Sequence, residues 1–315
     1  MVKSYLDFEQ PIADIENKIF ELENSDLGAD QIKKEIIGLN ESAVKLTEKI
    51  YSNLSAWQNV QVARHPERPH FIDYIERITD EFDELHGDRH FSDDRAVIGG
   101  IGKIGDYRVL IIGHEKGRST EDKIKHNFGM SQPEGYRKAC RLMKLAERFQ
   151  LPVVTMIDTP GAYPGIDSEE RGQSEAIAYN LLVMSSLKTP IIVNIVGEGG
   201  SGGALALGVG DHINMMEHAT YSVASPEACA SIVWRDAEKA AEASEAMKLN
   251  AKNILELQLI DEIIKEPLGG AHRNYDQASS NIKNSILNNL DRLNQIPLND
   301  LVERRYERLM GYGAL

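Results

Sequence analysis

The sequence is short of several residue types, and each shortage excludes a class of protein. Only two of its 315 residues are cysteines, Cys140 and Cys229, too few for a disulfide framework or a cysteine-rich zinc site. Lysine and arginine number 35 against 49 acidic residues. The resulting net charge of −14 argues against general nucleic-acid binding, which needs a basic surface.

Membrane and metal signals are missing as well. No apolar run reaches the roughly 18 residues that a membrane-spanning helix requires. The first nine residues carry acidic side chains where a signal peptide carries an apolar run, so we expect a cytoplasmic protein with no membrane partner. The nine histidines include no pair at metal-ligand spacing on a common helix. We therefore predict no metal in this chain.

Apolar residues make up 42% of the chain, enough at this length to bury a sizeable core. Nearly continuous apolar segments at 151–158 and 190–196 are typical of buried strands, and helical patterns cover 134–149 and 169–186. Strands that alternate with helices predict an α/β fold. The other elements expected are strands at 96–104, 107–113, 212–217, 220–224 and 260–264, and helices at 64–87, 203–208, 237–257, 279–293 and 298–309.

The N-terminal region is typical of a helical hairpin that precedes the main domain. Apolar side chains recur at helical spacing over 12–22 and again over 32–57, with a turn expected at 24–29. A lone pair of helices is marginally stable, so the hairpin must bury its apolar stripe against the main domain or a partner chain. We divide the chain into a hairpin at 1–62 and a main domain at 63–315.

Two glycine-rich turns follow the two buried strands, at 157–165 and 196–204. Open α/β sheets bind ligands at the carboxyl ends of their strands. Glycine lets the backbone approach a ligand closely, and a helix N-terminus presents unpaired N–H groups. Two such turns facing one cavity would stabilise developing oxyanions without any catalytic side chain. The alternative is that these glycines only allow tight turns.

The second turn also matches motifs of two other protein classes. Residues 197–202 fit the dinucleotide-binding fingerprint, but the helix that follows is expected to end near residue 208, too early for that motif. Residues 199–203 fit the nucleophile elbow of serine hydrolases, with Ser201 as the nucleophile. An elbow needs a downstream histidine, and the candidates are His212, His218 and His272. A serine hydrolase is therefore the alternative from another class.

A local basic cluster stands out in this acidic chain. Its members lie on one face of the expected helix 134–149 and in the segment before it, and they are Lys116, Arg118, Lys123, Lys125, Arg137, Arg141, Lys144 and Arg148. Such a cluster guides an anionic substrate or an acidic partner in some proteins, although a solvated helix face is the commoner case.

The two turns and several other segments closely resemble the carboxyltransferase α subunit of bacterial acetyl-CoA carboxylase. The resemblance covers nearly the whole chain. The turn segments that carry it are Asp158–Gly165 (DTPGAYPG), Glu169–Glu175 (EERGQSE) and Gly197–Ala204 (GEGGSGGA). Further matching segments are Phe8–Ile12, Ala63–Pro66, Phe82–Asp88, Asn127–Met130, Pro133–Lys138, Ser225–Glu227, Pro267–Arg273 and Arg304–Met310.

The resemblance implies a crotonase-like fold of repeated ββα units. It also implies transfer of a carboxyl group from carboxybiotin, tethered to a biotin carboxyl carrier protein, onto acetyl-CoA. The product is malonyl-CoA, in the first committed step of fatty acid biosynthesis. Biotin is not attached to this chain in that family, and biotin carboxylase is a further partner. The family's active unit is an α2β2 heterotetramer whose zinc ribbon belongs to the β subunit.

For the site itself, we expect backbone N–H groups rather than side chains to do the chemistry. Releasing carbon dioxide from carboxybiotin leaves charge on the ureido oxygen, and deprotonating acetyl-CoA leaves an enolate oxygen, so two oxyanions need donors. The residues expected to form these oxyanion holes are Gly161, Ala162, Gly199, Gly200, Gly202 and Gly203. Substrate contacts are expected from Tyr163, Pro164, Gly165, Lys125 and Arg137.

Overall fold

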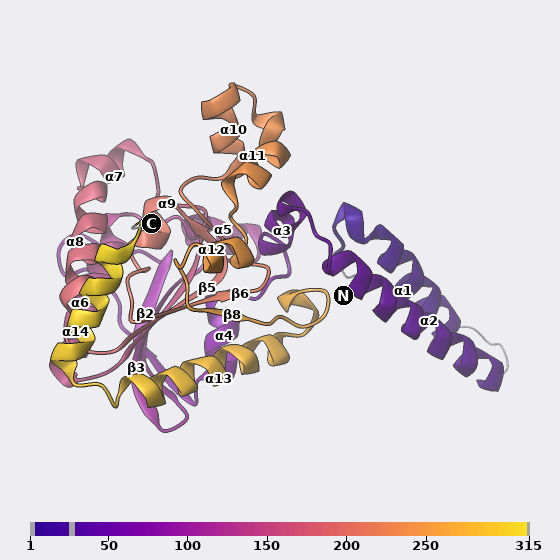
Figure 1. Ribbon diagram of the computed structural model, residues 1–315, viewed down its shortest axis with the longest axis horizontal. Coiled ribbons are helices and arrows are strands. Elements are labelled where there is room, and N and C mark those ends of the chain that lie inside the picture. The colour runs from indigo at the N-terminus through magenta and orange to yellow at the C-terminus, as the bar shows by residue number, and fades with distance from the viewer. Residues whose placement is uncertain (1–3, 25–28, 314–315) are drawn as a thin grey trace.

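One mixed sheet of eight strands forms the centre of the computed structural model, and helices surround it (Figure 1). The structure describes residues 4–24 and 29–313. Along the sheet the strands follow the order β1-β2-β3-β4-β5-β6-β8, and β7 pairs with β5. The strands are β1 Glu81–Glu84, β2 Val97–Ile104, β3 Tyr107–His114, β4 Val153–Thr159, β5 Ile191–Gly200, β6 His212–Met216, β7 Thr220–Ser222 and β8 Glu262–Ile264.

The chain direction changes partway across the sheet. Strands β1, β2 and β3 are antiparallel, whereas β3, β4, β5, β6 and β8 run parallel to one another, and β7 runs parallel to β5. The strands predicted at 96–104 and 107–113 are confirmed and form a β-hairpin, because Ile104 pairs with Tyr107 across a two-residue turn in which Gly105 takes a φ of +58°. Since β4 and β5 are parallel neighbours, the turns that follow them begin side by side.

The prediction of one helix over 64–87 is correct only for residues 71–78 and wrong on both sides of them. Helix α4, Phe71–Ile78, ends because the backbone of Thr79 is extended, and the following strand β1 pairs with β2. A Cβ atom on Gly100 of β2 would lie 2.2 Å from the Asp83 carbonyl oxygen. The glycines of β2 therefore let β1 lie close, a contact that helical periodicity in the sequence does not reveal.

The other helices include two that were not predicted, α5 at Thr120–Lys125 and α10 at Pro226–Trp234. Helix α10 begins with Ser225 as its N-cap and Pro226 in the first turn, both of which are helix-start signals that periodicity alone passed over. The helices of the main domain are α3 Ala56–Ala63, α4, α5 Thr120–Lys125, α6 Pro133–Phe149, α7 Ile166–Glu170, α8 Gln173–Ser186, α9 Ser201–Leu205, α10 Pro226–Trp234, α11 Ala240–Met247, α12 Ala251–Glu256, α13 Tyr275–Leu293 and α14 Leu298–Gly311.

Two predicted helices are each split in two. The segment 169–186 is interrupted at Gly172, whose φ is +83°, between α7 and α8. The segment 237–257 is interrupted at Lys248, whose φ is +51°, between α11 and α12. A residue in the left-handed conformation cannot continue a right-handed helix, so each helix ends there.

The central strands are buried on both faces, as their apolar runs predict. Every residue of β4 is buried, and so is every residue of β6. Helix α6 packs on β2 and β3 and against α8, while α13 packs on α4, β5 and β8. This packing fixes the strand ends that carry the two glycine-rich turns.

The N-terminal hairpin is confirmed, although its second helix is shorter than expected. Helices α1, Gln10–Glu23, and α2, Ala29–Tyr51, pack against each other and project from the main body (Figure 1). The expected turn at 24–29 falls largely on residues 25–28, outside the described residues. A separate helix, α3, begins after Ser55, whose side chain and that of Gln58 form a capping box. Helix α3 packs on α11 and on the sheet.

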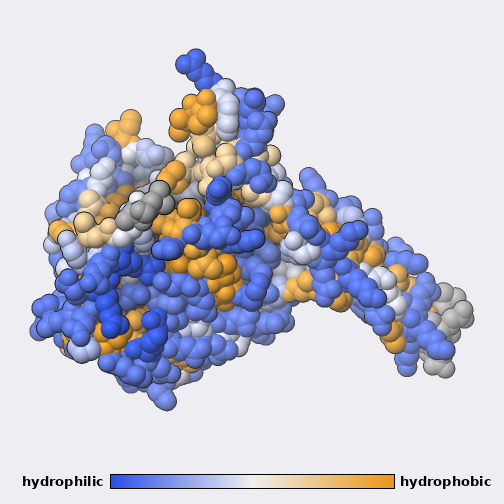
Figure 2. All heavy atoms as spheres, viewed as in Figure 1, coloured by the Kyte–Doolittle hydropathy of each residue, from blue (hydrophilic) through white to orange (hydrophobic). Residues whose placement is uncertain are grey.

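The hairpin leaves apolar side chains on its surface. Phe20 is 66% exposed and Ile37 is 59% exposed, and Figure 2 shows apolar atoms along the projecting helices. Contacts within the chain therefore bury only part of the hairpin's apolar stripe. Within residues 4–24 and 29–313, no helix is both long and apolar enough to cross a membrane.

The last helix is fastened to the core by one buried arginine. The side chain of Arg305 in α14 is fully buried and forms two hydrogen bonds to the Asp211 carboxylate, at 2.8 and 2.7 Å. It also donates to the carbonyl oxygens of Met184, Leu187 and Thr189 at 2.7–3.0 Å. A charged group this deep is tolerated because each of its nitrogens has partners.

Arg305→Met is expected to lower the free energy of unfolding by about 3–5 kcal/mol, because it leaves the buried Asp211 carboxylate without its cation. Equilibrium unfolding in urea measures the change. Arg304→Met, at the exposed neighbouring position, is the control and should change stability by less than about 0.5 kcal/mol. Equal stabilities for the two variants would show that Arg305 does not fasten α14.

Candidate active site

The two glycine-rich turns lie against each other at the ends of β4 and β5. A Cβ atom on Gly203 would lie 2.7 Å from the Gly161 carbonyl carbon and 2.8 Å from the Ala162 nitrogen. A Cβ atom on Gly200 would lie 2.2 Å from the Pro160 carbonyl oxygen. The two turns therefore touch, and glycine is required at both positions because backbone fills the space that a side chain would occupy.

The glycines of the second turn differ in the room around them. At Gly199 a Cβ atom would lie 2.7 Å from the Tyr221 ring. At Gly202 the nearest atom would be the Ile177 Cδ1 at 3.4 Å, which is ordinary contact. Gly202 is thus the one position among these that accepts a small side chain without moving the other turn.

Hydrogen bonding within the first turn divides its amides into engaged and free groups. The Gly161 N–H donates to Thr159 Oγ1 at 3.1 Å, and Gly161 has a φ of +152°, which favours glycine. The Tyr163 N–H donates to the Ser131 carbonyl oxygen at 2.9 Å. No acceptor for the Ala162 N–H occurs within the described part of the chain. Ala162 is therefore the donor of this turn that is available to a ligand.

The second turn supplies its free amides from the start of α9. Residues 201–203 precede the first intrahelical hydrogen bond of α9, so their N–H groups have no helical acceptor. The side chain of Ser201 is exposed, and its backbone has a φ of +50°. Together with Ala162, these amides form a patch of donors on two touching turns, which is what stabilising negative oxygen atoms requires.

The residues expected to contact substrate beside the first turn are only partly accessible. The Tyr163 ring lies over Gly165, where a Cβ atom would come within 2.3 Å of Cε1, and the Tyr163 carbonyl accepts from Gln173 Nε2 at 2.9 Å. Pro164 is exposed. Lys125 is exposed at the end of α5, and its substrate contact stays a prediction.

Arg137 already has partners in the structure. Its guanidinium donates to Asp88 at 2.9 Å, to Glu134 at 2.8 Å and to the Arg171 carbonyl oxygen at 2.9 Å. These bonds join α6 to the loop after β1 and to the end of α7. In the structure, Arg137 therefore crosslinks these segments through hydrogen bonds. A substrate contact through Arg137 stays a prediction.

Most of the other basic residues also bind groups of this chain, which differs from the solvated helix face that is the commoner interpretation of a basic cluster. Arg141 donates to the Gly87 carbonyl oxygen at 3.0 Å, and Lys144 donates to the Tyr179 hydroxyl at 2.8 Å. Lys116 is 15% exposed, and it contacts acidic side chains at the ends of both β4 and β5.

Lys116 joins the carboxylates of both strand ends. Its Nζ lies 2.7 Å from Asp158 Oδ1 and 2.6 Å from Glu198 Oε2, and Arg64 Nε lies 2.6 Å from Glu198 Oε1. Burial alone would raise the pKa of Glu198, but Lys116 and Arg64 outweigh it and lower that pKa to about 2. Arg64 also pairs with Glu227 of α10 at 2.6 Å.

Sequence reasoning missed this cluster because its members are far apart in the chain and Lys116 was grouped with surface bases. One signal was available: Asp158 ends an apolar strand and Glu198 interrupts a glycine run. Acidic groups in such buried positions need cationic partners.

The serine hydrolase alternative lacks its histidine. No hydrogen bond to the Ser201 hydroxyl is found among the described residues. The three candidate histidines have other neighbours: His212 lies 3.3 Å from Glu262, His218 lies 3.3 Å from Asn59, and His272 stacks on His65. The dinucleotide motif fails as well, because α9 has only five residues.

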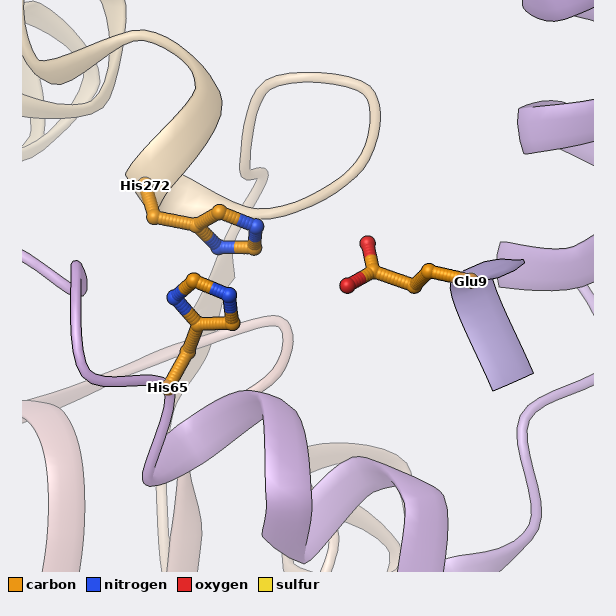
Figure 3. Close-up of side chains that lie close together, drawn as sticks. All are labelled: Glu9, His65 and His272. Atoms are coloured by element: carbon orange, nitrogen blue, oxygen red, sulfur yellow. The ribbon is translucent and has the colours of Figure 1, made fainter. Parts of the chain in front are cut away.

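One cluster of possible metal ligands occurs in the described residues, at the base of the hairpin. Glu9, His65 and His272 place ligand atoms within 4.8 Å of one another, with the carboxylate directed toward both rings (Figure 3). The rings stack with centroids 3.7 Å apart and an interplanar angle of 11°. Ring-nitrogen lone pairs lie in the ring plane, so stacked rings direct them side by side rather than toward one ion.

Glu9 is instead used to hold the hairpin. Its carboxylate accepts from the Tyr51 hydroxyl of α2 at 2.8 Å and from Arg273 at 3.3 Å. Burial, together with the charges of His65 and Arg273, lowers the pKa of His272 to about 2, so the stacked ring stays neutral at ordinary pH. The cluster is best understood as the joint between the hairpin and the main domain.

The hollow beside the turns is small. It is lined by Arg64, Pro160, Ser225 and residues 198–200, between the second turn and the start of α10. The larger hollows found in the described part lie elsewhere, one beside α14 and one along the hairpin. Residues 161–162 and 201–203, which belong to the two turns, do not line any of these three hollows.

Known proteins are similar in sequence to this chain over nearly its whole length. The family model described as acetyl co-enzyme A carboxylase carboxyltransferase-like matches residues 5–313. A Chromohalobacter salexigens protein named acetyl-coenzyme A carboxylase carboxyl transferase subunit alpha is 58% identical, over 100% of this chain and 99% of its own. The Alcanivorax borkumensis protein of the same name is 58% identical, over 99% of this chain and 97% of its own.

Solved structures with lower identity share the fold. Transcarboxylase 12S matches 73% of this chain with a TM-score of 0.58 and 17% identity, and this chain spans 44% of that one. The β subunit of Pseudomonas aeruginosa geranyl-CoA carboxylase matches 80% of this chain with a TM-score of 0.53 and 18% identity, and this chain spans 45% of it. The expected crotonase-like α/β fold is thereby confirmed. The chain belongs to the family of acetyl-CoA carboxylase carboxyltransferase α subunits.

Proposed function

We propose that this chain is the α subunit of a carboxyltransferase that carries a carboxyl group from carboxybiotin to acetyl-CoA and so forms malonyl-CoA for fatty acid biosynthesis. The observation that carries the proposal is the 58% identity over full length to relatives named for this activity. The two touching turns with free amides are the chemical support, since this reaction needs donors for oxyanions more than it needs a titrating side chain.

The amides of the two turns are assigned to the two oxygens that become negative. Carboxybiotin, delivered on a biotin carboxyl carrier protein, supplies the carboxyl group, and the ureido oxygen gains charge when that group leaves. The other developing charge is on the enolate oxygen of acetyl-CoA. The Ala162 N–H on one turn and the N–H groups of residues 201–203 on the other are close enough to hold the two reactants together.

A β subunit is proposed to cover the open side of the site. The relatives are named as α subunits, and this chain spans less than half of the carboxylase and transcarboxylase chains that share its fold. Apolar side chains are exposed just after the first turn, after β7 and on α10: Ile166 is 81% exposed, Val223 85% and Ile232 77%. A partner would bury them, and Figure 2 shows apolar atoms on the projecting α10. An α2β2 assembly, biotin carboxylase as a further partner and a cytoplasmic location remain predictions.

The chain alone is expected to be inactive, because one wall of the site is missing. Adding a β subunit that carries a four-cysteine zinc ribbon should produce malonyl-CoA from acetyl-CoA and carboxybiotin, as measured by chromatography of the CoA esters. Zinc, measured by mass spectrometry, should follow the β subunit, because two cysteines cannot form such a ribbon here. Malonyl-CoA formation by the isolated chain, or stoichiometric zinc in it, would contradict the shared site.

Ser201→Ala is expected to keep most of the carboxyl transfer, because the amide of residue 201 remains and the hydroxyl has no catalytic partner. A serine hydrolase would instead lose orders of magnitude in kcat. Turnover of the αβ assembly decides between them. Near-complete loss in a folded variant, with covalent labelling of Ser201 by a fluorophosphonate, would favour the hydrolase.

Gly203→Ala is expected to cut carboxyl transfer by about 10²–10³, because its Cβ atom displaces the Gly161–Ala162 peptide and its donor. Gly202→Ala is the matched control, since its Cβ atom meets only Ile177 at 3.4 Å and the amide is kept. Thermal stability, β-subunit affinity and turnover are measured on both proteins. Wild-type turnover in a well-folded Gly203→Ala assembly would mean that the turns are not the oxyanion sites.

A further inference from the structure

The parallel strands that lead into the two turns are not in continuous register. Ile157 of β4 pairs with Ile195 of β5, whereas Thr159 pairs with Gly199. Strand β5 therefore carries two more residues than β4 over this stretch, and residues 196–198 arch past Asp158. Such an irregularity re-aims the residues that follow it, and here the residues that follow are the turns.

The arch is filled by side chains rather than by ladder hydrogen bonds. The Asp158 carboxylate accepts the Glu198 N–H at 2.8 Å, and Arg68 Nε donates to the Val196 carbonyl oxygen at 2.8 Å. A Cβ atom on Gly197 would lie 2.3 Å from Asp158 Oδ1, so glycine is needed where the carboxylate enters. The position of the Asp158 side chain thus sets the shape of the arch.

Lys116 is the cation that binds both Asp158 of β4 and Glu198 of the arch, through its single side-chain nitrogen. Its Nζ lies 2.7 Å from Asp158 and 2.6 Å from Glu198, and its stem passes so close to Gly129 that a Cβ atom there would come within 2.8 Å of Lys116 Cγ. The side chains of Asp158 and Glu198 are 2% and 12% exposed. Solvent therefore screens their mutual repulsion weakly, and removing the ammonium would push them apart.

The other charged groups around Glu198 come from two further elements. Arg64, after α3, binds the second Glu198 oxygen, and it also binds Glu227 on α10. Glu198 thus faces Lys116 and Arg64, and Asp158 faces Lys116 and interacts electrostatically with the buried guanidinium of Arg68. Arg64 does not touch Asp158 in any contact found here, so it cannot replace Lys116 between the two strand ends.

We propose that Lys116 is a positioning residue for carboxyl transfer, which ties Asp158 to Glu198 and thereby holds the free amides of the two turns at a fixed separation. The inference rests on the proposed function. The role assigned to Lys116 is not substrate contact, because its ammonium is already shared by the Asp158 and Glu198 carboxylates. It acts through the backbone, and a misplacement of donors by about 1 Å is enough to lower a rate by about 10²-fold.

The test compares Lys116→Met with the double variant Lys116→Met/Glu198→Gln, each assembled with the β subunit. The single variant is expected to lose about 10²-fold in kcat, with KM for acetyl-CoA changed by less than about twofold. The double variant removes one of the two repelling charges, so its kcat should be at least tenfold higher than that of Lys116→Met. Lys188→Met, at an exposed position away from the arch, is the control for loss of a lysine.

The pH dependence of turnover is a second measurement, and a purely structural role of Lys116 would not change it. In Lys116→Met, protonation of Glu198 relieves the repulsion, so turnover relative to wild type should rise as the pH falls. In the double variant Glu198 is replaced by glutamine, so the ratio of its turnover to that of wild type should not rise in this way. In wild type, Lys116 and Arg64 outweigh the effect of burial and lower the pKa of Glu198 to about 2, so this carboxylate stays ionised.

Wild-type kcat in Lys116→Met, or a double variant no better than the single one, would overturn the inference. If Lys116→Met does not assemble, the double variant is still expected to fold and turn over, and its failure would overturn the inference equally. An inactive wild-type assembly would instead refute the proposed function, so the two failures are distinguishable.

Discussion

Gly203 lies against the Gly161–Ala162 peptide with no room for a side chain, and the geometry of the site depends on that contact. It brings an unbonded amide at the end of β4 next to the unbonded amides at the start of α9. Each amide is a partial positive charge that needs no titration and no reorganisation when charge develops nearby. Glycine makes the approach possible, and the parallel pairing of β4 with β5 makes the two turns neighbours.

Two features stabilise this contact: ion pairs near the strand ends, and the packing of the strands in the core. Lys116 joins Asp158 to Glu198, and Arg64 extends the same network to α10. The strands themselves are buried on both faces, so their ends move little. A site built from backbone needs this kind of support, because its donors cannot be placed by choosing side-chain rotamers.

Sequence reasoning predicted the parts of this arrangement that are local. Apolar runs gave the positions of β4 and β5, and glycine content marked both turns. It failed where contacts between distant segments decide the outcome: β1 forms because the glycines of β2 admit it, and Lys116 is mostly buried because Asp158 and Glu198 surround it. Left-handed residues such as Lys248, which ends α11, carry no sequence signal as plain as glycine. The assigned roles of Tyr163, Lys125 and Arg137 remain predictions.

The central claim is that backbone amides of the two turns hold the reacting oxygens. It is tested most directly by a crystal structure of the αβ assembly with free biotin and acetyl-CoA bound. The account predicts the ureido oxygen or the thioester oxygen within about 2.7–3.1 Å of the Ala162 nitrogen or of a nitrogen in residues 201–203. Both ligands bound in a productive pose, with neither oxygen within hydrogen-bond distance of these amides, would contradict it.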